Sequence, residues 1–315
     1  MTPTAPYARI TGWGKCLPDR VVDNFELEKV LPTSDEWIVT RTGIKERRIA
    51  AESDTPTTLG ARAAQQALAV AGLTPADLDL IIVATSSPER IMPATAAMIQ
   101  RELGATGIGA FDMNAACSGG LYALSAATSF IRSGMFRTVL VVGTEVYSRL
   151  LDWEDRSTCI LFGDGAGALV LQASDTPGGV LSAVLGNEPS GTEFITCDGL
   201  LGRAPSRAGD DPGYLAMNGP AVFKVAVRTM ADASRRAVEQ AGLQVGDIDL
   251  FVPHQANLRI ITAVGNQLGL DPGRVFTNVE KYGNTAAASV PIAICEAVES
   301  GRLLPGQRVV MVAAA

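Results

Sequence analysis

Short runs of apolar residues alternate along this chain with longer segments in which apolar residues recur at helical spacing. The runs IIVAT, TVLVVGT, GALVLQ, LFVP and RVVMVA are rich in β-branched residues and have the length of buried strands. The segments LGARAAQQALAVAG and Leu121 to Ile131 have the spacing of helices. Strands that are apolar on both faces and alternate with helices are typical of mainly parallel sheets with helices on their faces. The pattern therefore predicts an α/β protein.

The N-terminal region departs from this alternation. Tyr7 to Thr11 reads as a first strand, and Pro18 to Asp23 reads as a turn-rich connection. Residues 33–48 mix charged and apolar residues without a long period, so we predict a small inserted lobe there. Thr33 and Ser34 are candidate caps for a short helix within this lobe.

The pattern of the first half recurs in the second half. Ala71-Gly72-Leu73 with Asp77, Asp79 and Leu80 returns, at a constant offset of 170 residues, as Ala241-Gly242-Leu243 with Asp247, Asp249 and Leu250. Ser133-Gly134 with Arg137-Thr138-Val139 is echoed by Ser300-Gly301 with Arg308-Val309-Val310, and Phe276 matches Phe111. Such self-similarity indicates one fold used twice. We predict two duplicated α/β halves, residues 1–175 and 176–315, packed against each other.

The two halves differ at their ends. After VLVVGTE the first half continues through FGDGAGA to the strand ALVLQ, whereas the second half stops at Val312-Ala313-Ala314-Ala315. We therefore expect the second half to lack a final strand. FGDGAGA lacks the GxGxxG pattern and precedes a strand rather than a helix, which favours a tight turn over a phosphate-binding loop.

Composition narrows the classes of function. With 315 residues and 47% hydrophobic content, the chain can bury a large core. A net charge of −7 and a pI near 4.9 argue against nucleic acid or an anionic membrane as the principal partner. The chain has no apolar run long enough for a membrane span, and MTPTAPYARITGWG lacks the features of a signal peptide. The five cysteines are scattered without CxxC spacing, so we expect a reducing, cytoplasmic location.

The stretch FDMNAACSGG places Cys117 between a strand end and the start of a helix. Unpaired backbone N–H groups and the helix dipole at such a junction favour a thiolate and can hold an oxyanion. We therefore expect the pKa of Cys117 to lie below the free value of about 8.5, which would make the thiol a usable nucleophile. On this stretch alone, a small buried side chain is the simpler interpretation. The other cysteines lie in or beside apolar runs and are expected only to fill space: Cys16, Cys159, Cys197 and Cys295.

Two polar residues lie at corresponding points of the second half. His254, the single histidine, follows the strand Leu250 to Pro253, and ligands of α/β proteins bind at the carboxyl ends of strands. Asn284 lies in YGNT, near the counterpart of the Cys117 junction. Taken alone, the first could be a structural histidine and the second a helix N-cap.

Together the three residues suit decarboxylative carbon–carbon bond formation. A thiolate can accept an acyl group as a thioester. An imidazole N–H and a carboxamide N–H can stabilise the enolate that forms as carbon dioxide leaves. This chemistry needs no metal and no redox cofactor.

The motifs AACSGG, VPHQAN and YGNTAAASVP resemble the three active-site motifs of the β-ketoacyl-acyl-carrier-protein synthase III family, in order and at similar separations. The resemblance covers almost the whole chain and includes TSDEWIVTRTGI and FGDGAGA. It implies a thiolase-like fold, in which two duplicated halves with mainly parallel mixed sheets form five layers, αβαβα, and it implies a homodimer. The family condenses an acyl-CoA primer with malonyl-acyl carrier protein to start fatty acid synthesis.

The resemblance also implies residue roles. Cys117 would carry the primer, while His254 and Asn284 would bind the malonyl thioester carbonyl. The matched positions that contact CoA or the carrier protein are Trp37 and Arg156 at the CoA adenine, Arg41 and Asn257 along the CoA path, and Lys224 and Arg259 at the carrier protein. Met92 matches a position that helps to close the acyl pocket from the partner subunit. From the residues alone, Trp37 could equally belong to the core, and single basic residues are usually solvated surface.

The sequence departs from the family at its C-terminus. The family ends with a Gly-rich turn and a final strand, and one backbone N–H of that turn completes the oxyanion hole with the N–H of Cys117. This chain reads MVAAA instead. Because losing one oxyanion donor costs roughly a hundredfold or more in rate, we expect truncation or substitution of the printed chain.

Other classes of function differ from this resemblance in the residues that they need. Thiolases need a second active-site cysteine in a motif that this chain lacks, and the elongating synthases need two histidines. A related acyltransferase or starter-unit enzyme of secondary metabolism stays open. A non-catalytic scaffold is suggested by the missing strand, but a scaffold has no reason to keep Cys117, His254 and Asn284 together.

Overall fold

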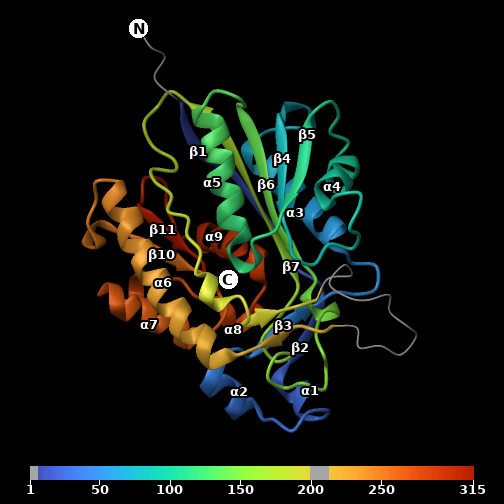
Figure 1. Cartoon of the computed structure of the whole chain (residues 1–315). Coiled ribbons are helices and arrows are strands. Elements are labelled where there is room, and N and C mark those ends of the chain that lie inside the picture. The colour runs from blue at the N-terminus through green and yellow to red at the C-terminus, as the bar shows by residue number, and fades with distance from the viewer. Residues whose placement is uncertain (1–5, 199–212) are drawn as a thin grey trace.

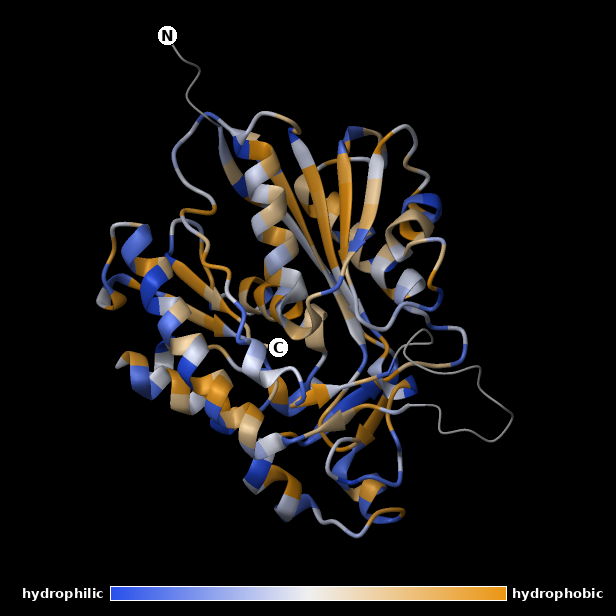
Figure 2. Ribbon diagram, viewed as in Figure 1, coloured by the Kyte–Doolittle hydropathy of each residue, from blue (hydrophilic) through white to orange (hydrophobic). Residues whose placement is uncertain are grey.

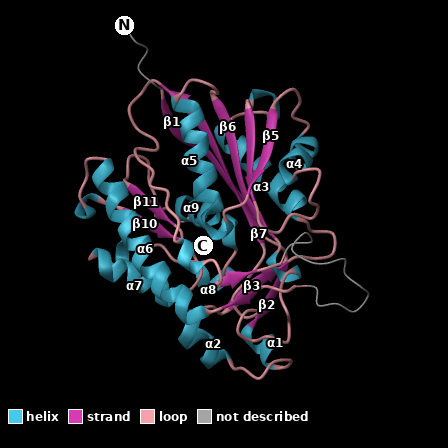
Figure 3. Cartoon of the chain, in the orientation of Figure 1, coloured by secondary structure: helices cyan, strands magenta, loops and turns pink. Residues whose placement is uncertain are grey.

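The computed structural model describes residues 6–198 and 213–315. The first five residues, which belong to the stretch inspected for a signal peptide, lie outside the described residues. Figures 1 and 3 show one large sheet, a smaller sheet beside it, and a lobe of short elements below both.

The large sheet has the strand order β1-β7-β6-β4-β5. Its members are β1 (Tyr7–Cys16), β4 (Leu80–Ala84), β5 (Gly109–Met113), β6 (Thr138–Glu145) and β7 (Gly165–Ser174). Strands β6, β4 and β5 are parallel, and β7 runs antiparallel to both of its neighbours. Four strands therefore run in one direction, and their carboxyl ends lie at the same end of the sheet.

Helices and a second sheet complete five layers. Helices α3 (Pro56–Ala71) and α4 (Thr95–Leu103) share a core with one face of the large sheet. On its other face, α5 (Gly119–Arg132) and α9 (Ser289–Glu299) share a core with both sheets, the second being β10 (Leu250–Pro253) and β11 (Val309–Val312). Helices α6 (Gly219–Gln240) and α7 (Leu258–Leu268) cover the outer face of that second sheet. The layers are αβαβα, as expected, and Figure 2 shows the apolar strands enclosed between helices.

A lobe is present, but it begins at Arg20, well before the predicted start at residue 33, because strand β2 pairs with β3. It contains α1 (Asn24–Glu28), α2 (Asp35–Thr42), β2 (Arg20–Asp23) and β3 (Glu46–Ile49). Ser34 caps α2, because its hydroxyl accepts a hydrogen bond from Trp37 N at 3.1 Å. The connection predicted at Pro18 to Asp23 is wrong in part, since most of it is strand β2. Its partner β3 lies more than twenty residues away, and local turn residues do not report such a pairing.

The remaining described elements are short. Strands β8 (Ile195–Thr196) and β9 (Ala216–Met217) pair with each other, and α8 (Val279–Tyr282) lies between α7 and α9 in the chain. FGDGAGA leads into β7 and Asp164 is fully buried, where it accepts hydrogen bonds from Ala50 N and Ser148 N. The predicted tight turn is therefore wrong in part, because residues 165–168 already belong to β7 and Phe162 forms a β-bridge with Asn284. Only Gly163 and Asp164 connect them, and the buried carboxylate of Asp164 holds this connection.

The register of the strands relates the two halves. Leu80 pairs with Val139 and Leu250 pairs with Val309, so the offset of 170 continues through these strands. The match of Arg137-Thr138-Val139 to Arg308-Val309-Val310 is therefore wrong by one residue, because the preceding loops differ in length. The match of Phe276 to Phe111 agrees with the register. Phe251 is the counterpart of Ile81, and Phe251 bridges Val275 just as Ile81 pairs with Ala110, so the next residues, Phe276 and Phe111, also correspond.

Candidate active site

Cys117 lies where the first half turns from sheet to helix. Strand β5 ends at Met113, the 3-10 turn η2 (Ala116–Ser118) follows, and α5 begins two residues after the cysteine. Ala116 has φ of +42°, a left-handed conformation that is costly for a residue with a side chain. The backbone therefore turns sharply just before Cys117. A Cβ atom on Gly120 would lie 2.5 Å from the carbonyl oxygen of Ala287, so only glycine permits this close approach to the second half.

Asn284 lies on the same backbone motif in the second half. Ala286 has φ of +44°, and the turn η8 (Ala286–Ala288) precedes α9 as η2 precedes α5. Asn284 Oδ1 accepts a hydrogen bond from Ala286 N at 2.8 Å, just as Asn114 Oδ1 accepts one from Ala116 N at 3.2 Å. Phe111 and Phe276 are 165 residues apart. Between Phe276 and Asn284 the second half has five additional residues, which include α8, so the offset returns to 170 and Asn114 is the counterpart of Asn284.

The two turns bring Cys117 and Asn284 together. Turn η2 packs against η8, and the Asn284 side chain forms a hydrogen bond with Cys117. The backbone of Asn284 is fixed independently, because its N–H donates to Leu161 O at 2.8 Å and its carbonyl accepts from Gly163 N at 3.0 Å. The side chain of Asn284 therefore meets the thiol from a rigid position.

The expected lowering of the Cys117 pKa is wrong. Burial raises the pKa of this thiol to about 12, and the charge of Glu145 raises it further. The hydrogen bond from Asn284 and one from the Cys117 backbone lower it, but by less. Cys117 is 8% exposed, and the free-energy cost of desolvating a thiolate there exceeds the stabilisation that the turn geometry gives it.

His254 reaches this region from the second sheet. It follows β10 as predicted, its backbone N–H donates to Val312 O at 2.7 Å, and the residue is 4% exposed. Burial lowers the pKa of the imidazole to about 4, so the ring is neutral near pH 7. Its Nδ1 lies 2.9 Å from the hydroxyl of Ser289, the first residue of α9.

Sequence reasoning missed the residues that support this histidine. Gln255 is 2% exposed, and its side chain donates to Pro253 O and Phe276 O and accepts from Asn278 N and Val279 N. These four hydrogen bonds satisfy the carboxamide and fix the backbone beside His254. A second polar residue next to His254, just past the end of a buried strand, was a signal that could have identified Gln255.

Glu145 is a second missed residue. It ends β6 fully buried, and its carboxylate accepts hydrogen bonds from Ser86 N and Ser87 N, each at 3.1 Å. Burial raises its pKa to about 7 despite these donors. Ser86 Oγ also lies 2.7 Å from the hydroxyl of Tyr147, whose ring stacks on Phe162 with centroids 5.0 Å apart. This network holds the ring of Tyr147 close enough to Cys117 for a thiolate there to raise the tyrosine pKa.

Three residues matched to CoA positions lie together, Trp37 and Arg41 on α2 of the lobe and Arg156 on the segment between β6 and β7. The guanidinium of Arg41 lies 4.4 Å from the centroid of the Trp37 ring, and that of Arg156 lies 5.0 Å from it. Arg156 also donates to Pro32 O. An aromatic ring between two guanidinium groups offers stacking surface and positive charge to a planar, anionic ligand.

The remaining matched residues lie on three surfaces. Asn257 caps α7, accepting from Arg259 N at 2.9 Å, and its Nδ2 donates to Arg41 O at 3.1 Å. Arg259 lies over the ring of Phe223, next to the exposed Lys224 on α6, with the guanidinium 5.6 Å from the ring centroid. Met92 is 82% exposed on the segment between β4 and α4, so this chain alone does not place it in the Cys117 site.

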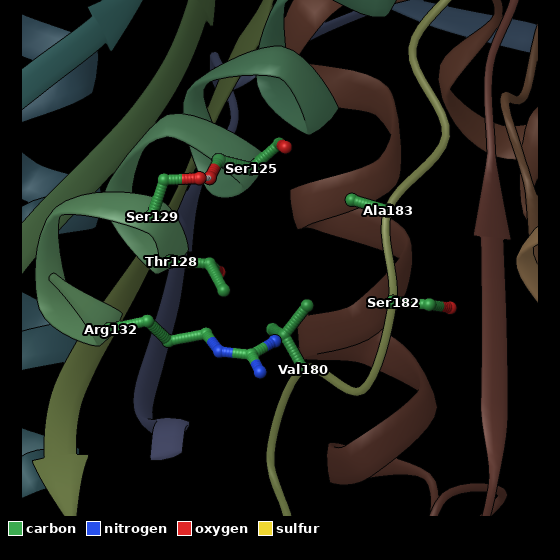
Figure 4. A pocket seen from close by; sticks show the side chains of 7 residues that line it. All are labelled: Ser125, Thr128, Ser129, Arg132, Val180, Ser182 and Ala183. Carbon is green, nitrogen blue, oxygen red and sulfur yellow. Dashed lines mark hydrogen bonds between the residues drawn. The ribbon is translucent and has the colours of Figure 1, made fainter. Parts of the chain in front are cut away.

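A separate cavity of about 230 Å³ lies toward the far end of α5 from Cys117 (Figure 4). Its walls are part of α5 and the segment from Val180 to Ala183, and Arg132 extends across it toward Val180. The hydroxyls of Thr128, Ser129 and Ser182 donate to backbone carbonyls. The cavity therefore offers a ligand a single unoccupied cationic group, and we assign it no role.

Within residues 6–198 and 213–315, His, Cys, Asp and Glu side chains do not gather in groups of three that could hold a metal ion. None of the helices in these ranges combines the length and apolar content that a bilayer crossing requires.

Comparison with known proteins gives consistent results. Residues 111–189 match the family described as 3-oxoacyl-[acyl-carrier-protein (ACP)] synthase III, and residues 238–315 match the C-terminal family of the same description. The curated β-ketoacyl-[acyl-carrier-protein] synthase III of Roseiflexus sp. is 49% identical over 98% of this chain and 95% of its own. The crystal structure of 3-oxoacyl-[acyl-carrier-protein] synthase III from Aquifex aeolicus is 47% identical, with a TM-score of 0.91 over 97% of this chain and 95% of that one. The priming β-ketosynthase of a polyketide pathway is 39% identical, with a TM-score of 0.92 over 99% and 93% of the two chains.

Proposed function

This chain belongs to the 3-oxoacyl-[acyl-carrier-protein] synthase III family, and we propose that Cys117, His254 and Asn284 carry out the family's condensing reaction here. The chain is thus an acyltransferase of fatty acid biosynthesis with the thiolase-like fold. The observation that carries the residue assignment is the packing of η2 against η8, which joins Cys117 to Asn284 by a hydrogen bond.

In the first step a short acyl-CoA, such as acetyl-CoA, transfers its acyl group to Cys117. The sulfur–carbon bond to Cys117 forms, the bond to the CoA sulfur breaks, and the thiol proton leaves with CoA. The hydrogen bond from Asn284 favours the thiolate that attacks. The substrate itself excludes water from an already buried site.

In the second step malonyl-acyl carrier protein replaces CoA. The bond to carbon dioxide breaks, and its electron pair forms an enolate whose oxygen accepts hydrogen bonds from His254 and Asn284. The enolate carbon attacks the Cys117 thioester and the bond from the acyl carbon to the cysteine sulfur breaks, giving 3-oxoacyl-acyl carrier protein, while the sulfur takes up a proton from solvent. A neutral imidazole suits this role, and burial lowers the pKa of His254 to about 4. The steps need no metal or redox cofactor.

The binding surfaces follow from the same assignment. Trp37, Arg41 and Arg156 would bind the adenine and phosphates of CoA, for which a ring between two guanidinium groups is suited. Asn257 positions Arg41 through its carbonyl. Lys224 and Arg259, at the start of α6 and α7, would attract the acidic carrier protein to a chain of net charge −7.

The chain is also proposed to form a homodimer of subunits that each contain two duplicated halves, residues 1–175 and 176–315. Strand β5 is an edge of the large sheet, and Phe111 on it is 36% exposed. Met92, 82% exposed, is available to reach the acyl pocket of a partner. A reducing cytoplasm suits a mechanism that needs Cys117 as a thiol.

The test uses acetyl-CoA and malonyl-acyl carrier protein with the purified chain. We expect the mass of the peptide containing Cys117 to increase by an acetyl group and acetoacetyl-acyl carrier protein to appear. Cys117→Ala should abolish both signals. Condensation should fall by about a hundredfold to a thousandfold in His254→Ala and in Asn284→Ala, since each removes a donor to the enolate. His254→Ala should keep the rate of acylation, whereas Asn284→Ala should slow it, because the hydrogen bond that favours the Cys117 thiolate is lost.

Other outcomes would change the assignment. Acylation without condensation by the unaltered chain would support the acyltransferase alternative. Absence of acylation by any short acyl-CoA would rule out Cys117 as the acyl carrier in this chain.

A further inference from the structure

The hydrogen bonds of Ser289 determine which nitrogen of His254 carries the hydrogen. Ser289 is 1% exposed, and its hydroxyl oxygen accepts a hydrogen bond from Gln255 N at 2.8 Å. The same oxygen lies 2.9 Å from His254 Nδ1. Either atom of this second contact could be the donor, so the assignment depends on where the remaining hydrogens can go.

The hydroxyl hydrogen of Ser289 has one acceptor in the part of the chain that the structure describes, and that acceptor is His254 Nδ1. If Nδ1 carried a hydrogen and donated it to Ser289, the serine hydrogen would be buried without an acceptor. A buried polar hydrogen without an acceptor is unfavourable, because it loses its hydrogen bond to water and gains none in the protein. The arrangement in which Ser289 donates and Nδ1 accepts satisfies every atom of this contact.

We propose that Ser289 is a positioning residue that holds His254 in the tautomer with the hydrogen on Nε2. Nε2 is buried and has no hydrogen-bond partner among residues 6–198 and 213–315. An N–H group left unsatisfied at a site is a donor reserved for a ligand, here the oxygen of the malonyl thioester as it becomes an enolate. That last clause rests on the proposed function, whereas the assignment of the hydrogen does not.

The backbone around the pair is built to keep this geometry. Gln255, whose backbone N–H donates a hydrogen bond to the Ser289 hydroxyl oxygen, is itself fixed by the four hydrogen bonds of its side chain. Ser289 begins α9 directly after η8, so the turn that follows Asn284 also delivers the hydroxyl to His254. The two enolate donors are thereby positioned by one short segment, residues 284–289.

The test uses the presence of a single histidine in the chain. In protein without an affinity tag and labelled with ¹⁵N-histidine, a long-range ¹H–¹⁵N spectrum near pH 7 contains the signals of one imidazole and identifies its tautomer directly. We expect the Nε2–H tautomer in the unaltered protein. The Nδ1–H tautomer, or an imidazolium, in the unaltered protein would overturn the proposal without any variant.

Ser289→Ala tests the cause. We expect Nδ1–H signals to appear, and condensation to fall about tenfold or more while acylation of Cys117 changes less than twofold. Ser289→Thr, which keeps the hydroxyl, should restore the Nε2–H tautomer and most of the condensation rate. Unchanged tautomer and rate in Ser289→Ala would overturn the proposal.

A matched control separates this role from general loss of packing. Ser234 is also 1% exposed and donates to Met230 O at 2.7 Å within α6, so Ser234→Ala removes an equally buried hydroxyl elsewhere. It should leave the His254 spectrum and the ratio of condensation to acylation unchanged. If the unaltered protein shows the Nε2–H tautomer but no condensation with any primer, the proposed function fails while the assignment of the hydrogen stands.

Discussion

At the scale of single residues, the site consists of polar groups whose environment opposes charge. Burial raises the pKa of Cys117 to about 12 and lowers that of His254 to about 4. Both groups are therefore neutral near pH 7, and charge appears only during the reaction. Such a site favours donors that are fixed beforehand over groups that ionise in the resting protein.

The pH dependence of thiol modification tests this description. The rate of alkylation of Cys117 by iodoacetamide should rise about tenfold per pH unit from pH 7 to 10 without levelling, because the thiolate fraction keeps growing below the raised pKa. Glutathione should level off above its pKa. Asn284→Ala should be slower at every pH, since the hydrogen bond that lowers the Cys117 pKa is lost. A plateau for Cys117 below pH 8, measured on its peptide by mass spectrometry, would contradict the raised pKa.

What the sequence predicts at this scale depends on local signals. Cys117, His254 and Asn284 follow strand ends in recognisable motifs, so their place in the site could be predicted. Ser289 could not, because its partner His254 lies 35 residues away and its own surroundings read as a helix of small residues. The raised pKa of Cys117 was also out of reach, since it results from desolvation by segments of both halves.

At the scale of elements, glycines allow the two halves to approach closely. An added Cβ at Gly143, within β6, would lie 2.4 Å from the carbonyl oxygen of Ala287 and 2.8 Å from its carbon. Turn η8 therefore rests directly on the backbone of the large sheet. The position of Asn284 depends on this contact, because η8 begins two residues after Asn284 and packs against the turn that carries Cys117.

Gly143→Ala should displace η8 with little change to the motifs themselves. We expect condensation to fall at least tenfold and the melting temperature to drop, since overpacking costs about 1–3 kcal/mol and small misplacements of reacting groups are expensive. Gly246→Ala is the control, because no heavy atom lies within 4 Å of its added Cβ. The measurements are the condensation rate and the melting temperature of both variants. Equal values for the two variants would show that η8 tolerates its displacement.

Elements with a strong period could be predicted, and elements held by distant partners could not. The helical spacing of Leu121 to Ile131 gave α5 nearly to its ends. Strand β2 was missed because it is held by β3 and by Arg47, which is fully buried and donates to Val22 O, Asn24 Oδ1 and Ile160 O. Nothing in the local pattern of ERRI marks one of its arginines as the buried anchor of the lobe.

At the scale of the whole molecule, the central layer explains why the site needs both halves. Helices α5 and α9 share one core with both sheets, so the turns that precede them face each other. The five layers could be predicted from the alternating pattern and the internal repeat together with the family resemblance. The one-residue error in matching Arg137 to Arg308 shows the limit, because a loop of different length hides the register that backbone pairing fixes.

The proposed dimer makes a prediction at this largest scale. Strand β5 leaves one edge of the large sheet without a partner in the described chain, and an open edge favours pairing with another strand. Phe111, at the centre of β5, is 36% exposed, and Ile91 and Met92 add exposed apolar surface on the segment that follows β4. Phe111→Lys places a positive charge on this edge in both copies. Because like charges on facing edge strands repel, we expect light scattering to show a shift from dimer to monomer.

The effect of losing the dimer on the choice of primer distinguishes the β5 edge from other surfaces as the interface. If Met92 of one subunit closes the acyl pocket of the other, monomeric Phe111→Lys should lose discrimination between short primers as it loses its partner. Val30→Lys is the control, since Val30 is 74% exposed on the lobe rather than on the edge strand, and it should stay dimeric. A dimer that survives Phe111→Lys would place the interface on another surface, and a monomeric unaltered chain would remove Met92 from the acyl pocket.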